Sequence, residues 1–235
     1  MPFSTSSRGR LTNRDLDRFP ANTLFDRLAR AVCGAGCLPR KELYEAWEVA
    51  RRVRRLFRGG RVVDLAGGHG LLAQTMLLLD DSSPGAVVAD KKLPASCATL
   101  HDALVKAWPR LSGRVQFIEC ELHRVDIMST DIVVSSHACG HLTDVVLDRA
   151  AAARARAAVL PCCHHLASSD ARDLSGWISG AVAIDIERAI RLRQRGYRIR
   201  SQTIPKGITP KNRLLVGEPD AAYEGVQRAT LTVDK

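Results

Sequence analysis

From residue 61 onward, short apolar runs alternate with longer segments in which apolar residues recur every three or four positions. The short runs have the length and composition of buried parallel strands, and the longer segments have the period of amphipathic helices. Strands are predicted at Arg61–Ala66, Ala86–Asp90, Val115–Glu119, Asp131–Ser136 and Ala157–Pro161. Helices are predicted at Leu71–Leu79, Leu93–Trp108, Leu142–Ala155 and Asp173–Arg195. Strands that alternate with helices indicate an α/β doubly wound sheet.

Two further strands are predicted after the last helix, at Tyr197–Thr203 and Arg213–Gly217. The loop between them, Ile204–Asn212, is too short for a helical crossover, so the two strands should pair antiparallel. We therefore expect a Rossmann-like, seven-stranded sheet that is mostly parallel and has an antiparallel last strand.

The pattern divides the chain into three parts. Residues 1–18 are polar and rich in serine and arginine, which predicts a disordered N-terminus. Residues 19–60 read as a helical extension, with an apolar stripe that includes Leu43, Trp47 and Val53. The arginines near its end, from residue 51 to 58, are expected to face solvent, where the helix dipole favours cations; a patch that faces RNA is the alternative. Residues 61–235 form the α/β domain, and a length of 235 residues suits one such domain.

Composition narrows the class of protein. No apolar stretch is long enough to cross a bilayer, and the first residues lack the apolar segment of a secretory signal, so a cytoplasmic protein is expected. The seven cysteines are an odd number, which favours reduced thiols. The net charge of +10 can attract a polyanion such as RNA. However, the charge is mostly arginine in an alanine-rich chain, as in proteins from GC-rich genomes, so nucleic-acid binding stays open.

A glycine-rich loop follows the first predicted strand. Its residues read Asp64-Leu-Ala-Gly-Gly-His-Gly70, and they lead directly into a helix. Glycines allow a sharp turn and a close approach to a ligand, and the helix N-terminus offers free N–H groups. The spacing differs from the G-x-G-x-x-G of dinucleotide-binding proteins, and Asp64 can face a cationic ligand.

Two neighbouring strands end in histidine and cysteine. The fourth strand runs into Ser136-His137-Ala138-Cys139-Gly140-His141, and the fifth into Pro161-Cys162-Cys163-His164-His165. Because open α/β sheets bind ligands outside the carboxyl ends of their strands, these residues should lie beside the glycine loop. Asp90, which ends the second strand, can accept hydrogen bonds from ribose hydroxyls at the same edge.

These motifs together resemble class I S-adenosylmethionine-dependent methyltransferases, whose first motif is usually written (D/E)-x-G-x-G-x-G. Ala66 stands where the first glycine is usual. The pair H-x-C-G-x-x-T-D and P-C-C-H-H resembles a branch of that class. The branch includes the zinc-finger tRNA 2′-O-methyltransferases and the glutathione S-transferase C-terminal-domain-containing methyltransferase group. This chain has no zinc-finger module, and Ser136 replaces a common lysine, so the second group is the closer match.

The resemblance implies S-adenosyl-L-methionine as cofactor. The residues expected to bind it are Asp64, Ala66, Gly67, Gly68, Gly70, Asp90, Glu121 and Ser136. For Glu121, a solvated loop acid is the alternative. Lys41 and Glu42 resemble an element placed near the donor pocket, or they form an ordinary charged first turn of a helix.

The residues of the methyl-acceptor site are inferred from the chemistry of their side chains. A neutral imidazole can take the proton of a hydroxyl or amine acceptor, so His137 is the first candidate base and His164 the second. Cys139 and Cys163 are expected to line the acceptor pocket. Lys211, Asn212 and Arg213 either bind acceptor phosphate or close the sheet. No metal is assigned, although the histidines and cysteines of the fourth and fifth strand ends offer enough ligands for zinc.

The predicted function is therefore methylation of RNA. A methyltransferase acting on protein or a small molecule is the second hypothesis, because the donor site says nothing about the acceptor. A non-catalytic nucleic-acid-binding module on the same fold is the third.

Overall fold

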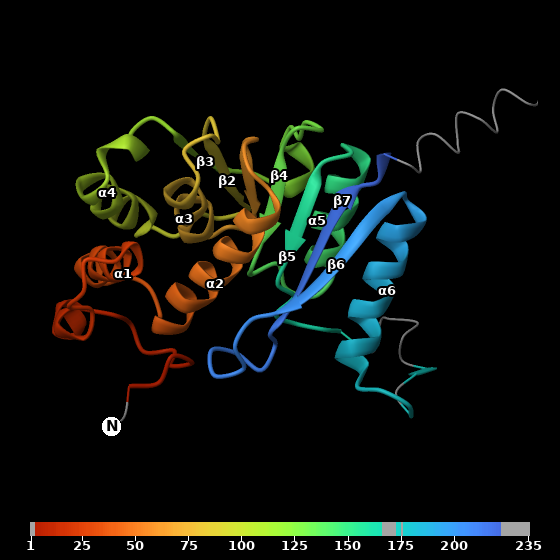
Figure 1. The fold of residues 1–235 in the computed structure, drawn as a ribbon, viewed down its shortest axis with the longest axis horizontal. Helices are drawn as coiled ribbons and strands as arrows, with labels where there is room; N and C mark the ends of the chain where they lie inside the picture. The colour runs from red at the N-terminus through yellow and green to blue at the C-terminus, as the bar shows by residue number, and fades with distance from the viewer. Residues whose placement is uncertain (1–2, 166–172, 175, 222–235) are drawn as a thin grey trace, which may run out of the picture.

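The computed structural model describes residues 3–165, 173–174 and 176–221, and its centre is a seven-stranded sheet (Figure 1). The strand order is β3-β2-β1-β4-β5-β7-β6. The strands are β1 (Val62–Leu65), β2 (Ala86–Asp90), β3 (Val115–Glu119), β4 (Ile132–Ser135), β5 (Arg156–Val159), β6 (Tyr197–Thr203) and β7 (Arg213–Pro219). The first five are parallel, and β7 is antiparallel to both β5 and β6. The predicted Rossmann-like sheet is confirmed.

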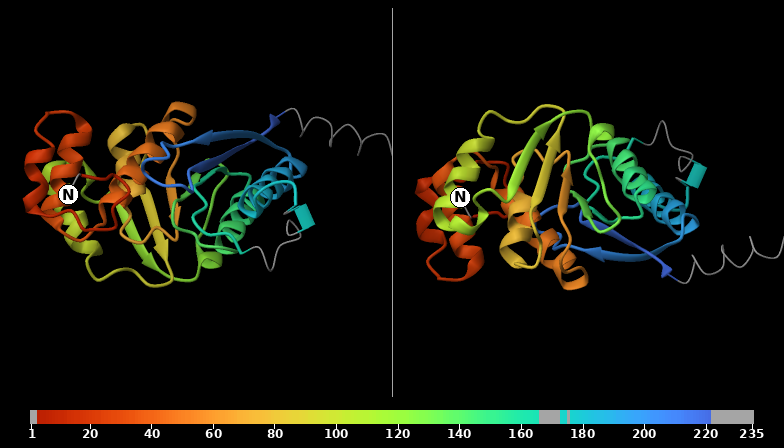
Figure 2. Two further views of the ribbon diagram at one scale, coloured as in Figure 1. Left: turned by 90° about the horizontal axis from the view of Figure 1, so that it is seen from below. Right: turned by 90° about the horizontal axis from the view of Figure 1, so that it is seen from above.

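Helices cover both faces of this sheet (Figure 2). They are α1 (Leu24–Ala35), α2 (Arg40–Leu56), α3 (Leu71–Leu79), α4 (Cys97–Ala107), α5 (Leu142–Ala152) and α6 (Gly180–Gln194). Successive strand side chains point to opposite faces. Val62 and Val88 accordingly share a core with α1 to α4, whereas Val63 and Val87 pack with α5 and α6. No helix in the described ranges is long and apolar enough to span a bilayer.

Element boundaries follow the sequence pattern closely where the apolar run is unbroken. The structure has β2, β3, β6 and α3 at the predicted residues. Helix α4 begins at Cys97 instead of Leu93, because the preceding residues form a separate turn in which the Cys97 N–H donates to the Pro94 carbonyl at 2.9 Å. Helix α6 begins at Gly180 instead of Asp173; of the predicted residues before it, residue 175 lies outside the described part of the chain.

The prediction of a disordered N-terminus was wrong for residues 3–18. Leu11 is fully buried, and its N–H donates to the carbonyl of Leu38 at 3.0 Å. The Phe3 and Phe19 rings pack edge to face, and Asn13–Arg18 forms the 3-10 helix η1. A few apolar side chains of this polar segment thus pack against the helical extension. The average composition of the segment does not reveal this packing.

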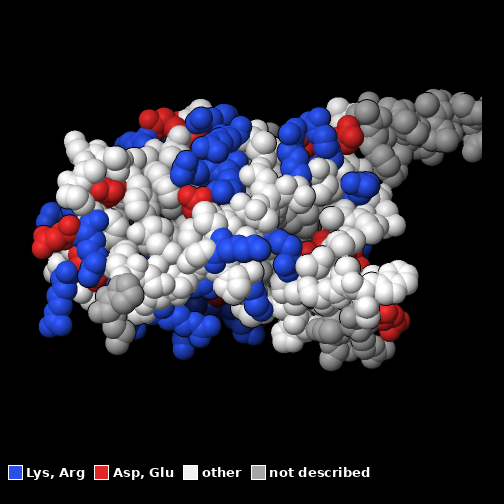
Figure 3. Space-filling model, turned by 60° about the horizontal axis from the view of Figure 1, so that its bottom comes forward, with Lys and Arg blue, Asp and Glu red and all other residues white. Residues whose placement is uncertain are grey.

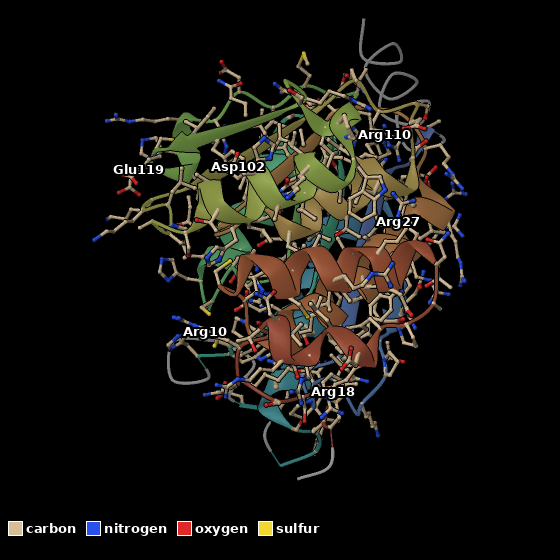
Figure 4. The ribbon with its side chains drawn as sticks, turned by 90° about the vertical axis from the view of Figure 1, so that its left-hand side faces the viewer. Arg10, Arg18, Arg27, Asp102, Arg110 and Glu119 are labelled. Atoms are coloured by element: carbon tan, nitrogen blue, oxygen red, sulfur yellow. The ribbon has the colours of Figure 1, made fainter. Side chains whose placement is uncertain are left out.

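The helical extension consists of two helices that share a core with the sheet. Gly36, at φ 65°, and Pro39 separate α1 from α2. Figure 4 shows α1 alongside α4, where the Arg27 guanidinium lies 5.0 Å from the Trp108 ring centroid. Because this core is continuous, residue 60 does not separate two hydrophobic cores.

One of the five arginines that were expected to face solvent is buried instead. Arg54 is 2% exposed and pairs with Asp80 at 3.2 Å, while its Nη2 donates to Ser83. The chain enters β1 directly after α2, so the arginines of the last α2 turns lie near the amino edge of the sheet. The carboxyl edge is at the other end of the strands.

Candidate active site

A cavity of about 380 Å³ opens at the carboxyl edge of the sheet, between α2, the loop after β1, and the ends of β2 and β4. Its volume falls within the range of small-molecule sites. The lining residues are Glu42, Ala46, Ala66, Gly67, Gly68, His69, Leu71, Leu72, Asp90, Pro94, Ser136, His137 and Leu142. Six of them were predicted: Ala66, Gly67, Gly68, Asp90, Ser136 and His137.

The glycine loop forms the floor of the cavity and is held in left-handed backbone conformations. Gly68 has φ 52°, and no atom lies within 4 Å of where its Cβ would stand, so its backbone is open to a ligand. Gly70 has φ 69° and packs on Val88, where a Cβ would come within 2.7 Å of a methyl group. Its role is therefore to fit the loop onto the sheet, and it does not line the cavity. Ala66 has φ 55°, a backbone conformation that is unfavourable for alanine. The glycine that is usual at this position adopts it without steric cost.

Asp64 lies beneath the loop instead of on the cavity wall. Its Oδ2 accepts from the Ala73 N–H at 3.3 Å, while its buried Oδ1 has no hydrogen-bond partner. Burial raises the pKa of Asp64 to about 7. The motif thus predicts the position of the acid in the chain, but its side chain supports the first turn of α3 and does not face the cavity directly.

The two other predicted donor-binding acids differ in position. Asp90 lines the cavity, and its Oδ2 accepts from the Gly68 N–H at 3.0 Å, which ties the end of β2 to the glycine loop. Glu121 lies outside the cavity, is about half exposed and pairs with Lys91 at 2.9 Å. Its placement matches the solvated loop acid that was the alternative for this residue.

His137 and Glu42 bring titratable groups to the cavity from β4 and α2. The His137 ring reaches solvent through the cavity, but the surrounding protein removes much of its hydration. This desolvation, helped by the charge of Lys41, lowers the pKa of His137 to about 4. Burial and the charge of Glu45 raise the pKa of Glu42 to about 7. His137 is therefore neutral at pH 7, whereas Glu42 is poised between its two protonation states.

His164, the second candidate base, does not line this cavity. Its Nε2 lies 2.8 Å from Asp185 Oδ1, and Asp185 also accepts from Arg213 Nε at 2.7 Å. Asn212 donates to the Ile204 carbonyl at 2.8 Å and so closes the loop between β6 and β7. Arg213 and Asn212 therefore have structural partners, while Lys211 is exposed at the loop.

Cys139 and Cys163 come together at the same edge of the sheet, but they do not line the donor cavity. Both lie against Cys162, which was not among the predicted acceptor-pocket residues. Cys139 is exposed and the other two are half-buried. The sequence placed these thiols at neighbouring strand ends, and the parallel pairing of β4 with β5 brings them into contact.

The cavity suits S-adenosylmethionine, which is cationic at its sulfonium and its amino group. Asp90 and Glu42 offer carboxylates, while Ala46, Leu71 and Leu142 supply apolar wall. The open backbone at Gly68 permits close approach, and the Oδ1 of Asp64, which has no hydrogen-bond partner, leaves an acceptor under the floor. When bound, this cofactor supplies an activated methyl group.

Comparison with known proteins agrees with this geometry. Residues 41–170, more than half of the chain, match the family model described as "Methyltransferase domain". A comparison with curated proteins finds no match. The solved structures that resemble this chain are similar in fold at low sequence identity.

Three of those structures illustrate the likeness. The S-adenosylmethionine-dependent methyltransferase SibL in its apo form is 19% identical with a TM-score of 0.52, over 90% of this chain and 66% of SibL. Magnesium protoporphyrin IX methyltransferase from Synechocystis PCC 6803, with bound S-adenosylhomocysteine, is 14% identical with a TM-score of 0.51, over 87% of this chain and 97% of that one. An O-methyltransferase family protein from Burkholderia thailandensis is 20% identical with a TM-score of 0.48, over 88% of this chain and 63% of that one.

This chain therefore spans less than two thirds of the Burkholderia protein and of SibL. The matched segment includes the glycine loop, Asp90 and the β4 and β5 ends, which surround the cavity and the thiols. The chain belongs to the methyltransferase domain family.

Proposed function

We propose that this enzyme methylates RNA, with the donor held in the cavity at the carboxyl edge and His137 accepting the proton of a ribose hydroxyl or base nitrogen. The observation that carries the proposal is the His137 imidazole in the cavity, with cationic side chains on neighbouring segments of the chain. Arg10 is within electrostatic range of His69, Lys41 of His137, and Lys211 of Cys139. Three separate segments of the chain therefore contribute positive charge at the carboxyl edge, two beside residues of the cavity and one beside Cys139, outside it.

The N-terminal segment contributes to this arrangement. The Thr5 hydroxyl donates to the Gly207 carbonyl at 2.8 Å, so the segment that carries Arg10 touches the loop that carries Lys206 and Lys211. Figure 3 brings the lower side of Figure 1 forward and shows lysine and arginine at several places on that face. Figure 4 labels Arg10 and Glu119, the end of β3, on the same side of the molecule. A basic rim at the carboxyl edge suits a phosphate backbone that must reach the donor.

The residues of the cavity have separate tasks in this mechanism. Methyl transfer is an in-line displacement, so positioning of the two reactants supplies much of the rate enhancement. Asp90, Ser136 and the Ala66–Gly68 backbone hold the donor, and the apolar wall excludes water. His137 accepts the acceptor's proton, and Glu42 in the same cavity offers a second proton acceptor whose pKa is closer to neutral.

The motifs after β4 and β5 are compatible with an RNA substrate but do not select it, because the closer resemblance is to the glutathione S-transferase C-terminal-domain-containing group. H-x-C-G-x-x-T-D and P-C-C-H-H resemble the branch that includes tRNA methyltransferases. The match to the methyltransferase family favours an enzyme over the third hypothesis, a nucleic-acid-binding module without catalysis. The second hypothesis, transfer of the methyl group to protein or to a small molecule, is a possible outcome of the experiment described next.

The test uses purified protein and S-adenosylmethionine labelled in the methyl group. RNA, protein and small molecules from cells that lack the gene are offered separately. We expect label in RNA, sensitive to ribonuclease and reduced by added salt. Lys211→Glu should lower this incorporation, whereas Lys106→Glu, on α4 at the opposite end of the sheet, should not. Label in protein or small molecules but not in RNA would refute the RNA proposal.

A further inference from the structure

Three cysteine thiols meet at the carboxyl edge of the sheet, outside the donor cavity. Cys139 Sγ lies 3.0 Å from Cys162 Sγ, and Cys162 Sγ lies 3.8 Å from Cys163 Sγ. All three sulfur atoms lie within 4.8 Å of one another. We refer to Cys139, Cys162 and Cys163 as the thiol cluster. The proposed methyl transfer uses none of them.

The fold builds this cluster from two chain segments and fixes it with backbone contacts. Strands β4 and β5 pair in parallel, with Ser135 opposite Val159, so the residues that follow both strands leave the sheet side by side. The Leu160 N–H donates to the Ser135 carbonyl at 2.9 Å, and the Gly140 N–H donates to the Cys163 carbonyl at 3.3 Å. The three thiols therefore converge because of strand register.

The sulfur geometry suits a tetrahedral metal ion. With metal–sulfur bonds of about 2.3 Å, as in zinc sites, the sulfur atoms of a tetrahedral site stand roughly 3.8 Å apart. One pair already has that separation, and the shorter 3.0 Å contact requires a small adjustment by Cys139, which is exposed. Exposure of Cys139 also gives an ion access from solvent.

The charge around the cluster is compatible with a zinc–thiolate centre. A divalent ion bound by three thiolates carries a net charge of −1. The ammonium group of Lys211 lies within electrostatic range of Cys139 and Cys163, and that of Lys41 within range of Cys163. Two lysines can thus offset the negative charge. His164 is not counted as a ligand, because the group of ligand atoms that lie within 4.8 Å of one another contains the three thiols and not the His164 ring.

We propose that the thiol cluster binds one zinc ion through Cys139, Cys162 and Cys163, with the fourth position taken by water or another ligand. Zinc sites with three protein ligands keep a position that water or a substrate occupies. The inference stands on the sulfur positions alone and does not depend on the RNA proposal. A disulfide between Cys139 and Cys162, or close packing of three inert thiols, would use the same residues without a metal.

Elemental analysis and cobalt substitution test the proposal on the full-length protein. The protein is purified with a phosphine reductant, loaded with zinc and freed of unbound metal. We expect about one equivalent of zinc, and a cobalt-loaded sample with the thiolate-to-metal charge-transfer and intense visible bands of a tetrahedral sulfur site. Cys139→Ser and Cys163→Ser should each weaken zinc affinity at least about tenfold. Cys120→Ser, at the end of β3 on the same edge, is the matched control and should keep the metal.

S-adenosylhomocysteine binding shows whether each variant is folded, because the donor cavity contains no cysteine among its lining residues. Less than about a tenth of an equivalent of zinc in the loaded, reduced protein would overturn the proposal. A double variant, Cys139→Ser with Cys162→Ser, that held zinc as tightly as the natural sequence would also overturn it. Isolation of a Cys139–Cys162 disulfide that persists in reductant, without metal, would assign the residues to a cross-link instead.

Discussion

Methyl transfer is expected to fall by about 10²–10⁴-fold when His137 is replaced by alanine, the range of a lost general base. His137 is neutral at pH 7, because desolvation lowers its pKa to about 4, so its lone pair is available to the acceptor without prior deprotonation. The affinity for S-adenosylhomocysteine should change by no more than a few-fold, since Asp90 and the glycine loop keep their mutual hydrogen bond. Single-turnover transfer and calorimetry measure the two quantities separately.

His69→Gln is the matched control for this prediction. His69 lines the same cavity, but its Nε2 lies 2.9 Å from the Ser96 hydroxyl, so we expect it to orient the loop without taking part in proton transfer. Unchanged turnover in His137→Ala would remove His137 from its proposed role. If Glu42→Gln then lost most of the activity, the base would be Glu42.

Replacing Arg188 with alanine should lower the free energy of unfolding by about 3–5 kcal/mol, as expected when one partner of a buried ionic network is removed. The Arg188 side chain is 2% exposed. It donates to Asp144 Oδ2 at 2.9 Å, to Asp185 Oδ1 at 3.3 Å and to the Gly140 carbonyl at 2.9 Å. Its loss would leave two acids without their shared cation and would release the loop between β4 and α5.

Arg191→Ala provides the comparison, because Arg191 pairs with the same Asp144 but is half exposed. An exposed pair contributes only about 0–1 kcal/mol, so this variant should unfold close to the natural protein. Urea unfolding of both variants measures the difference. Equal stability of the two would mean that the Arg188 network does not hold α6 to the β4–α5 loop.

Much of the fold was predictable because strands and helices leave different periods in the sequence. The run Ala86–Asp90 is apolar on both faces and bounded by turns, so β2 was assigned correctly to the residue. The prediction of disorder for residues 3–18 was wrong for a related reason. The burial of Leu11 and Phe3 depends on a surface formed by helices later in the chain, and the average composition of a short segment does not reveal two buried side chains.

The candidate site was predictable in position more than in orientation. The motif located Asp64 at the end of β1. Only the packing of α3 shows that the Asp64 carboxylate accepts a hydrogen bond from the Ala73 N–H. Glu42 precedes β1 by a whole helix, and it reaches the cavity because α2 packs beside the sheet edge. A family resemblance suggested a place near the donor for Glu42, whereas its local sequence is only that of a charged helix start.

The cavity that contains Asp90 and Ser136 is proposed to bind the methyl donor. Calorimetric titration with S-adenosylhomocysteine tests this binding directly. We expect one molecule bound per chain, an affinity at least about tenfold weaker in Asp90→Ala, and no change in Glu121→Ala, whose carboxylate lies outside the cavity. No detectable binding at millimolar ligand, or an Asp90→Ala variant that binds as tightly as the natural protein, would show that this cavity is not the donor site.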